Sequence, residues 1–256
     1  MQTIIERLDK FEGNVGFYYK NLQTQEIISY HEDMAFQAAS VIKIPVMIEL
    51  FRRFEEGSLK KEDLVPINPE DKLPPCGALT FLHNGIQVTL LDICTLMIVY
   101  SDNTATNILI RLLGIDQINQ TLKELNCEVT RLNRFLFDEE SSAKGIQNYI
   151  SPIEISHLLE LMYQRVLISP AASDEMLSIL KNQQINSKLP FFITDSTKIA
   201  HKTGEDDGIT HDVGIVFTKK PYIIAFCSEH VLVPKFERFI QDVNYEFALE
   251  NGLQGD

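Results

Sequence analysis

Serine and lysine residues one helical turn apart are the first candidates for chemistry in this chain. The pattern S-x-x-K occurs four times, at Ser40/Lys43, Ser58/Lys61, Ser141/Lys144 and Ser178/Lys181. A lysine three residues after a serine lies on the same helical face, where a neutral amine could take the serine proton and create a nucleophile. Both residue types are common, so the surroundings must decide which pair is functional.

The surroundings favour Ser40 and Lys43. Residues 38–48 are apolar almost throughout, and Lys43 is the single charge among them. Desolvation there would lower the pKa of Lys43 toward a value useful for accepting the serine proton. The alternative is structural, with Ser40 capping a helix and Lys43 extending its amine to water. The other three pairs lie in polar or charged segments and are interpreted as solvated surface.

Two further polar motifs follow in the chain. Ser101-Asp102-Asn103 comes after an apolar helix, and Lys202-Thr203-Gly204 ends a strand candidate at 197–202. Taken singly, the first could be a helix cap and the second a strand end before a turn. In this order after Ser40/Lys43, the three motifs together are specific.

The elements that must position these motifs fall into two kinds. β-rich runs occupy both ends of the chain, and helical periodicity dominates the middle. The strand candidates are 15–20, 26–30, 197–202, 212–218 and 222–228, and the helix candidates are 2–12, 41–55, 90–99, 104–113, 115–125, 152–165, 171–181 and 236–249.

Strands at the two ends can share a sheet only if the chain returns on itself. We therefore predict an α/β chain of the α+β type, with one antiparallel sheet flanked by terminal helices and an inserted all-helical subdomain. Residues 1–256 would form one domain, with 1–39 and 191–256 in the sheet part and 40–190 in the helical part. The active site is expected at their junction.

Composition excludes several classes of function. A net charge of -13 and a pI near 4.9 disfavour a nucleic-acid partner. The chain lacks an apolar run of eighteen residues, so no membrane span is expected. The first residues lack the pattern of a secretory signal, so the protein is expected in the cytoplasm unless a signal has been removed. A monomer acting on a small molecule is the expected state.

Cysteine usage points away from metal chemistry. Cys76, Cys94, Cys127 and Cys227 are widely spaced, with no C-x-x-C pattern and no accompanying histidine pattern for zinc. We interpret all four as free structural thiols. No metal or organic cofactor is expected.

The three motifs in this order resemble those of the class A β-lactamases and the related penicillin-binding transpeptidases. Residues 89–107 are similar to that family's central helix and its following loop, and residues 129–134 resemble the start of its omega loop. The likeness covers essentially the whole chain.

This resemblance implies catalytic roles for four residues. Ser40 would be acylated, Lys43 would help to deprotonate it, and Ser101 would pass a proton to the departing amine nitrogen. Lys202 would be the cation that holds a substrate carboxylate.

The resemblance also implies a set of substrate-binding residues. Thr203 would share the substrate carboxylate with Lys202, and Asn103 would bind the acyl-side amide. Gly204 belongs to the same motif, and the backbone N–H groups of Ser40 and Glu205 would form an oxyanion hole.

The sequence departs from the family at one important position. Class A enzymes carry a water-activating glutamate two residues after the arginine that matches Arg134, but this chain has Leu136 there, and Glu140 where the family has asparagine. One of the acids at 138–140 could replace the missing base, although a solvated acidic loop is the favoured interpretation. Losing a general base costs about 10²–10⁴ in rate, so we expect fast acylation and slow deacylation.

Three acids, at Glu205, Asp206 and Asp207, follow the third motif. They should weaken the binding of anionic drugs and favour a substrate with a positive charge. His211 falls near the family's carboxylate-binding position and is a candidate substrate contact, with a structural histidine as the alternative. A triad of Ser40 with His211 and Asp212 is disfavoured, because neighbours on a strand point to opposite faces.

Three functions remain open at this stage. The leading hypothesis is β-lactamase-like hydrolysis of β-lactam amide bonds through an acyl-enzyme at Ser40. A D-Ala-D-Ala peptidase or an esterase with the same nucleophile is the second. The third is a penicillin-binding sensor that is acylated once and deacylates slowly.

Overall fold

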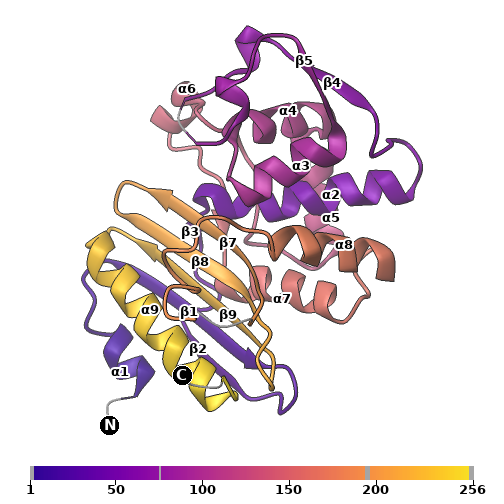
Figure 1. Cartoon of the computed structure of the whole chain (residues 1–256). Coiled ribbons are helices and arrows are strands. Elements are labelled where there is room, and N and C mark those ends of the chain that lie inside the picture. The colour runs from indigo at the N-terminus through magenta and orange to yellow at the C-terminus, as the bar shows by residue number, and fades with distance from the viewer. Residues whose placement is uncertain (1–2, 75, 194–196, 254–256) are drawn as a thin grey trace.

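A five-stranded antiparallel sheet organises the molecule (Figure 1). The computed structural model describes residues 3–74, 76–193 and 197–253. In order across the sheet, the strands are β2 (Ile27–Tyr30), β1 (Asn14–Asn21), β9 (Tyr222–Glu229), β8 (Ile209–Val216) and β7 (Ile199–Asp206).

Inside this open sheet, the first strand of the chain pairs with the last. β1 and β9 pair along their full lengths, from Asn14 opposite Glu229 to Asn21 opposite Tyr222. Alternation along β1 sends Phe17 and Tyr19 into one apolar core and Tyr18 into another. Each face of the sheet therefore buries its own layer.

The terminal helices cover one face of the sheet. α9 (Val233–Glu250) crosses this face and α1 (Ile4–Leu8) lies beside it (Figure 1). Their shared core is rich in aromatic rings, such as Phe226 and Phe236. α1 ends at Leu8, four residues earlier than the periodicity predicts, and Gln2 of the predicted helix lies outside the described residues.

The middle of the chain supplies the helices on the other side. They are α2 (Lys43–Glu55), α3 (Leu90–Val99), α4 (Asn103–Leu113), α5 (Ile115–Glu124), α6 (Glu139–Ala143), α7 (Pro152–Tyr163) and α8 (Pro170–Leu180). The predicted fold class is confirmed. Across the described ranges, no helix has both the length and the apolar character that crossing a bilayer requires.

The inserted part is not all-helical, contrary to the prediction. β4 (Leu64–Ile67) and β5 (Ile86–Thr89) form a small two-stranded sheet, and β3 (Phe36–Gln37) pairs with β6 (Tyr149–Ile150). Short 3-10 helices occur at η1 (Ala39–Ile42), η2 (Pro69–Asp71) and η3 (Leu79–Phe81). β4 and β5 are each four residues long, too short for periodicity to separate them from loops.

The third motif lies inside a strand rather than at its end. β7 continues through Gly204 to Asp206, and the turn to β8 falls at Asp207-Gly208, where Gly208 has φ +67°. Asp-Gly is a preferred pair for a two-residue hairpin turn, because the glycine tolerates a positive φ. Glu205 and Asp206 are therefore fixed on the strand.

Candidate active site

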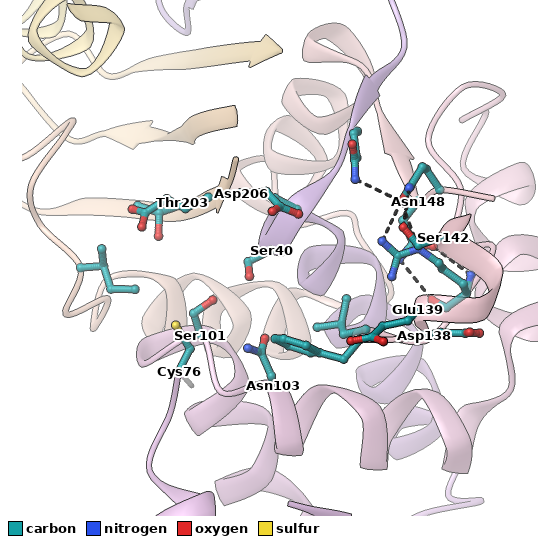
Figure 2. Close-up of a pocket in the computed structure, with 18 residues that line it drawn as sticks. Ser40, Cys76, Ser101, Asn103, Asp138, Glu139, Ser142, Asn148, Thr203 and Asp206 are labelled. Atoms are coloured by element: carbon teal, nitrogen blue, oxygen red, sulfur yellow. Dashed lines mark hydrogen bonds between the residues drawn. The ribbon is translucent and has the colours of Figure 1, made fainter. Parts of the chain in front are cut away.

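A cavity of about 430 Å³ opens where β7, η1 and the start of α4 meet a loop at residues 134–148. Its lining includes five of the predicted site residues, namely Ser40, Ser101, Asn103, Thr203 and Glu205. Figure 2 shows Ser40 at the centre, with Ser101 and Thr203 toward one end and Asp138 and Glu139 toward the other.

Ser40 sits in η1, immediately before α2 begins at Lys43. No side chain caps either helix at its N-terminus, so the capping alternative for Ser40 is wrong. Ala39, just before it, has φ +42°, a costly backbone conformation for a residue with a Cβ. The chain thus presents the serine hydroxyl to the cavity on a strained turn.

Lys43 is fully buried, and its amine is surrounded by oxygen acceptors. Nζ lies 2.9 Å from Ser40 Oγ, 2.7 Å from the Ser101 carbonyl, 3.0 Å from Ser101 Oγ and 2.9 Å from Asn103 Oδ1. The alternative in which Lys43 reaches outward to water is therefore wrong. Burial, followed by the nearby charge of Lys202, holds the pKa of Lys43 well below its ordinary value, which favours the neutral amine.

Ser101 joins the two lysines. Its Oγ accepts from Lys43 Nζ at 3.0 Å and from Lys202 Nζ at 3.0 Å, so its own proton is free to point elsewhere. Its φ of +54° is a strained conformation of the kind that clusters at functional sites. Asp102 caps α4 by accepting from the Ala105 N–H, so this motif combines a helix cap with two site residues.

Lys202 is a second fully buried amine. Besides Ser101, Nζ donates to the Thr203 carbonyl at 2.8 Å. Burial is the largest influence on its pKa, and despite the opposing effect of Asp212 the pKa falls to about 7. Burial thus lowers the pKa of both amines, and Asp212 and Glu205 act in the opposite direction on Lys202.

Gly204 has a packing role rather than a place in the cavity lining. A Cβ on this residue would lie 3.0 Å from His211 Cδ2 and 3.2 Å from Val41 Cγ2. Glycine therefore allows β7 to approach η1 closely enough for Lys202 and Ser40 to share one cavity.

His211 does not line the cavity, which corrects its prediction as a substrate contact. Its ring is fully buried, with Nε2 2.8 Å from the Gln37 carbonyl and Nδ1 accepting from the Ser228 N–H at 3.1 Å. Burial lowers its pKa to about 4, so the neutral ring is the stable form. The structural alternative holds, and Asp212 instead contacts His201 at 2.9 Å.

The loop at residues 134–148 forms the opposite wall. Leu136 lines the cavity, and its backbone is held on both sides by the side chain of Asn107, with an N–H bond of 2.9 Å to Oδ1 and a carbonyl bond of 2.9 Å from Nδ2. This clamp was not predicted, although Asn107 stands in the segment that resembles the family. It fixes Leu136, the position to which the sequence resemblance assigns a water-activating glutamate.

Two of the three acids of this loop, Asp138 and Glu140, are bonded to residues other than Ser40. Asp138 caps α6 through Ser141, and Glu140 pairs with Lys144 at the surface. In the described ranges no carboxylate bonds to Ser40 or Lys43. The solvated-loop interpretation therefore fits Asp138 and Glu140 best.

Two residues of the site carry no local sequence signal. Lys188 is completely buried and lies 2.5 Å from Glu205 Oε1, so it neutralises one of the three predicted rim acids. Cys76 lines the cavity and is exposed, which corrects its prediction as a structural thiol. Cys94, Cys127 and Cys227 are buried free thiols.

The described side chains offer no place for a metal ion. Within residues 3–74, 76–193 and 197–253, no three histidine, cysteine, aspartate or glutamate residues gather as potential ligands.

Comparison with known proteins adds to this geometry. The sequence profile of the family described as "Beta-lactamase enzyme family" matches residues 1–243. Among curated proteins, "Beta-lactamase ROB-1" of Haemophilus influenzae is 24% identical over 239 residues, which cover 89% of this chain and 75% of that protein.

Two solved structures are similar along nearly the whole chain. A β-lactamase from Sphaerobacter thermophilus is 27% identical, has a TM-score of 0.90, and is matched over 98% of this chain and 97% of its own. A leucine-to-glutamate variant of PBP-A, solved as an acyl-enzyme complex with penicillin G, is 27% identical, with a TM-score of 0.86 and coverage of 96% and 92%.

Proposed function

Because the chain belongs to the β-lactamase enzyme family, we propose that it is a serine hydrolase that opens β-lactam rings through an acyl-enzyme at Ser40. The observation that carries the proposal is the arrangement of two buried amines around one hydroxyl. Lys43 and Lys202 each lie 3.0 Å from Ser101 Oγ, and Lys43 also lies 2.9 Å from Ser40 Oγ.

This arrangement provides a complete path for the proton during acylation. Neutral Lys43 takes the Ser40 proton while Oγ attacks the lactam carbonyl, and the C–N bond of the ring then breaks. The departing nitrogen receives a proton from Ser101, and Lys43 returns one to Ser101. Protonated Lys202 holds the substrate carboxylate, with Thr203 beside it.

The remaining predicted residues bind rather than react in this proposal. Asn103 binds the acyl-side amide, and the backbone N–H groups of Ser40 and Glu205 stabilise the oxyanion, each contributing about 3 kcal/mol. Hydrolysis requires a further step, in which water attacks the ester carbonyl and Ser40 leaves.

A specific observation favours a second function, that of a slowly turning over penicillin-binding protein. Leu136 stands where the sequence resemblance implies a water-activating glutamate, and an aliphatic side chain cannot accept a proton from water. The similar PBP-A variant, which replaces a leucine by glutamate, was captured as an acyl-enzyme with penicillin G. Hydrolysis and trapping therefore share their first step and differ in the fate of the ester.

Intact mass measured over time after mixing with benzylpenicillin tests both functions. A Ser40-dependent adduct that decays while the drug is consumed supports a β-lactamase, and an adduct that persists supports a penicillin-binding role. If Ser40→Ala shows the same adduct or the same drug consumption, Ser40 is not the nucleophile.

The organisation of the chain is part of the same proposal. The protein would act as a monomer on small molecules without a nucleic-acid partner, and as one domain with the sheet part at 1–39 and 191–256 and the helical part at 40–190. Placing the cavity between these parts explains why its residues come from both.

A further inference from the structure

The two ends of the cavity carry opposite charges. At one end Lys202 is buried against Ser101 and Thr203. At the other end Glu139 comes from α6, while Asp206, from the end of β7, lies close to Ser40; both acids line the cavity (Figure 2). A ligand that spans the cavity therefore has Lys202 behind Ser101 and Thr203 at one end, and carboxylates beside and beyond Ser40.

Glu139 and Asp206 are the uncompensated acids of this lining. Glu205 is paired with Lys188 at 2.5 Å, and the charge of Asp138 is opposed by Arg134, whose guanidinium bonds to the Gln147 amide oxygen. Neither Glu139 nor Asp206 forms an ion pair with a residue in the described ranges. Their charges thus remain available to a ligand.

Asn103 provides an independent sign of what the ligand contains. This residue is only 7% exposed and lines the cavity, and its Oδ1 accepts from Lys43 at 2.9 Å. Its Nδ2 has no hydrogen-bond acceptor among the described residues. This amide donor lines the cavity without a protein acceptor, so it can donate to a carbonyl oxygen of the occupant.

We propose that the cavity selects a dipolar acyl donor, whose carboxylate faces Lys202, whose side-chain amide carbonyl accepts from Asn103, and whose acyl group carries a cation between Asp206 and Glu139. This inference rests on the proposed function, since it names the substrate class of the same site. It also explains how a protein of net charge -13 can use an anion clamp and still favour a positively charged acyl group.

A matched pair of substrates tests the proposal. Two penicillins are compared that differ only in the side-chain amide. One carries a trimethylammonioacetyl group and the other its uncharged isostere, a tert-butylacetyl group, so the two compounds differ in one permanent charge. We expect the second-order rate of Ser40 acylation, corrected for each compound's alkaline hydrolysis, to be about tenfold higher for the cation. Added salt should reduce the ratio because both carboxylates are near solvent.

Substitutions assign this preference to the two acids. The double variant Asp206→Asn/Glu139→Gln should bring the ratio close to one, while Asp207→Asn/Glu140→Gln, which removes two neighbouring charges outside the lining, should keep it. Equal rates for the two compounds, or an unchanged ratio in the first double variant, would overturn the inference and leave the proposed function intact. Absence of acylation by either compound would overturn both.

Discussion

The two walls of the cavity are built in contrasting ways. On the wall made by η1, residues 101–103 and β7, the half-buried Ser40 is bonded to the buried Lys43, which together with the buried Lys202 is bonded to Ser101. On the loop wall, Leu136 is held by its backbone, Asp138 caps α6, and Glu139 lines the cavity without a bond to Ser40 or Lys43. The contrast separates the two halves of the proposed reaction: the residues assigned to acyl-enzyme formation are bonded together on the first wall, whereas Leu136 offers no proton acceptor on the second.

Removing the base from the first wall should have the largest effect. Lys43→Met keeps the length of the side chain but cannot take the Ser40 proton, so acylation by benzylpenicillin should slow by about 10³–10⁴. Stopped-flow kinetics measures this acylation rate. Lys144→Met, which changes the lysine of a surface S-x-x-K pair, is the matched control. A loss of less than tenfold would remove Lys43 from the role of base.

Adding a base to the second wall should have the next largest effect. Leu136→Glu places a carboxylate on the backbone that Asn107 clamps, and the acyl-enzyme should then decay about 10²-fold faster. The decay of the adduct by intact mass gives the rate. Leu136→Gln is the control, because glutamine has a similar shape but is not a base, and its acyl-enzyme should still decay slowly. Equal acceleration of the decay in Leu136→Glu and Leu136→Gln would show that base catalysis is not the cause.

Behind the first wall, His211 should make stability depend on pH. Its folded pKa of about 4 lies below the ordinary value of 6.5, so the unfolded chain binds the proton more readily. The stability is present above pH 6.5 and is lost as pH falls toward 4, by about 2–3 kcal/mol at pH 4.5. Urea unfolding at pH 7 and 4.5 measures this loss, which should shrink in His211→Gln. An identical loss in the variant would contradict the assignment.

The smallest expected effect concerns the charge on the first wall. Since burial lowers the pKa of Lys202 to about 7, acylation by an anionic penicillin should fall about tenfold for each pH unit above that value, as the amine loses its proton. The pH profile of the second-order rate measures it. In Lys202→Arg the side chain stays charged, so the fall in the acylation rate above pH 7 should disappear. A fall of unchanged slope in that variant would point to another titrating group.

Much of the fold and part of the site could be predicted from the sequence. β-rich ends around a helical middle require the chain to return, and Lys43 in an apolar segment needs a polar partner. The small β4–β5 sheet was missed because its strands are too short to show a period.

Residues that meet only through the tertiary fold escaped prediction. Lys188 pairs with Glu205 across a loop, and Asn107 clamps Leu136 from 29 residues away. His211 was placed wrongly because strand alternation gives a residue's face but not what packs against that face. Cys76 was misjudged because its exposure depends on a loop that follows no periodic pattern.

The pairing of β1 with β9 also has a consequence for synthesis. A ribosome makes β9 roughly 200 residues after β1, so the hairpin of β1 and β2 must wait for its central neighbour while the intervening helices are already emerging. Ser40 and Ser101 are likewise translated long before Lys202. A nascent chain would therefore contain Ser40 but not yet Lys202. Acylation by benzylpenicillin should begin only after β7, β8 and β9 have joined the sheet.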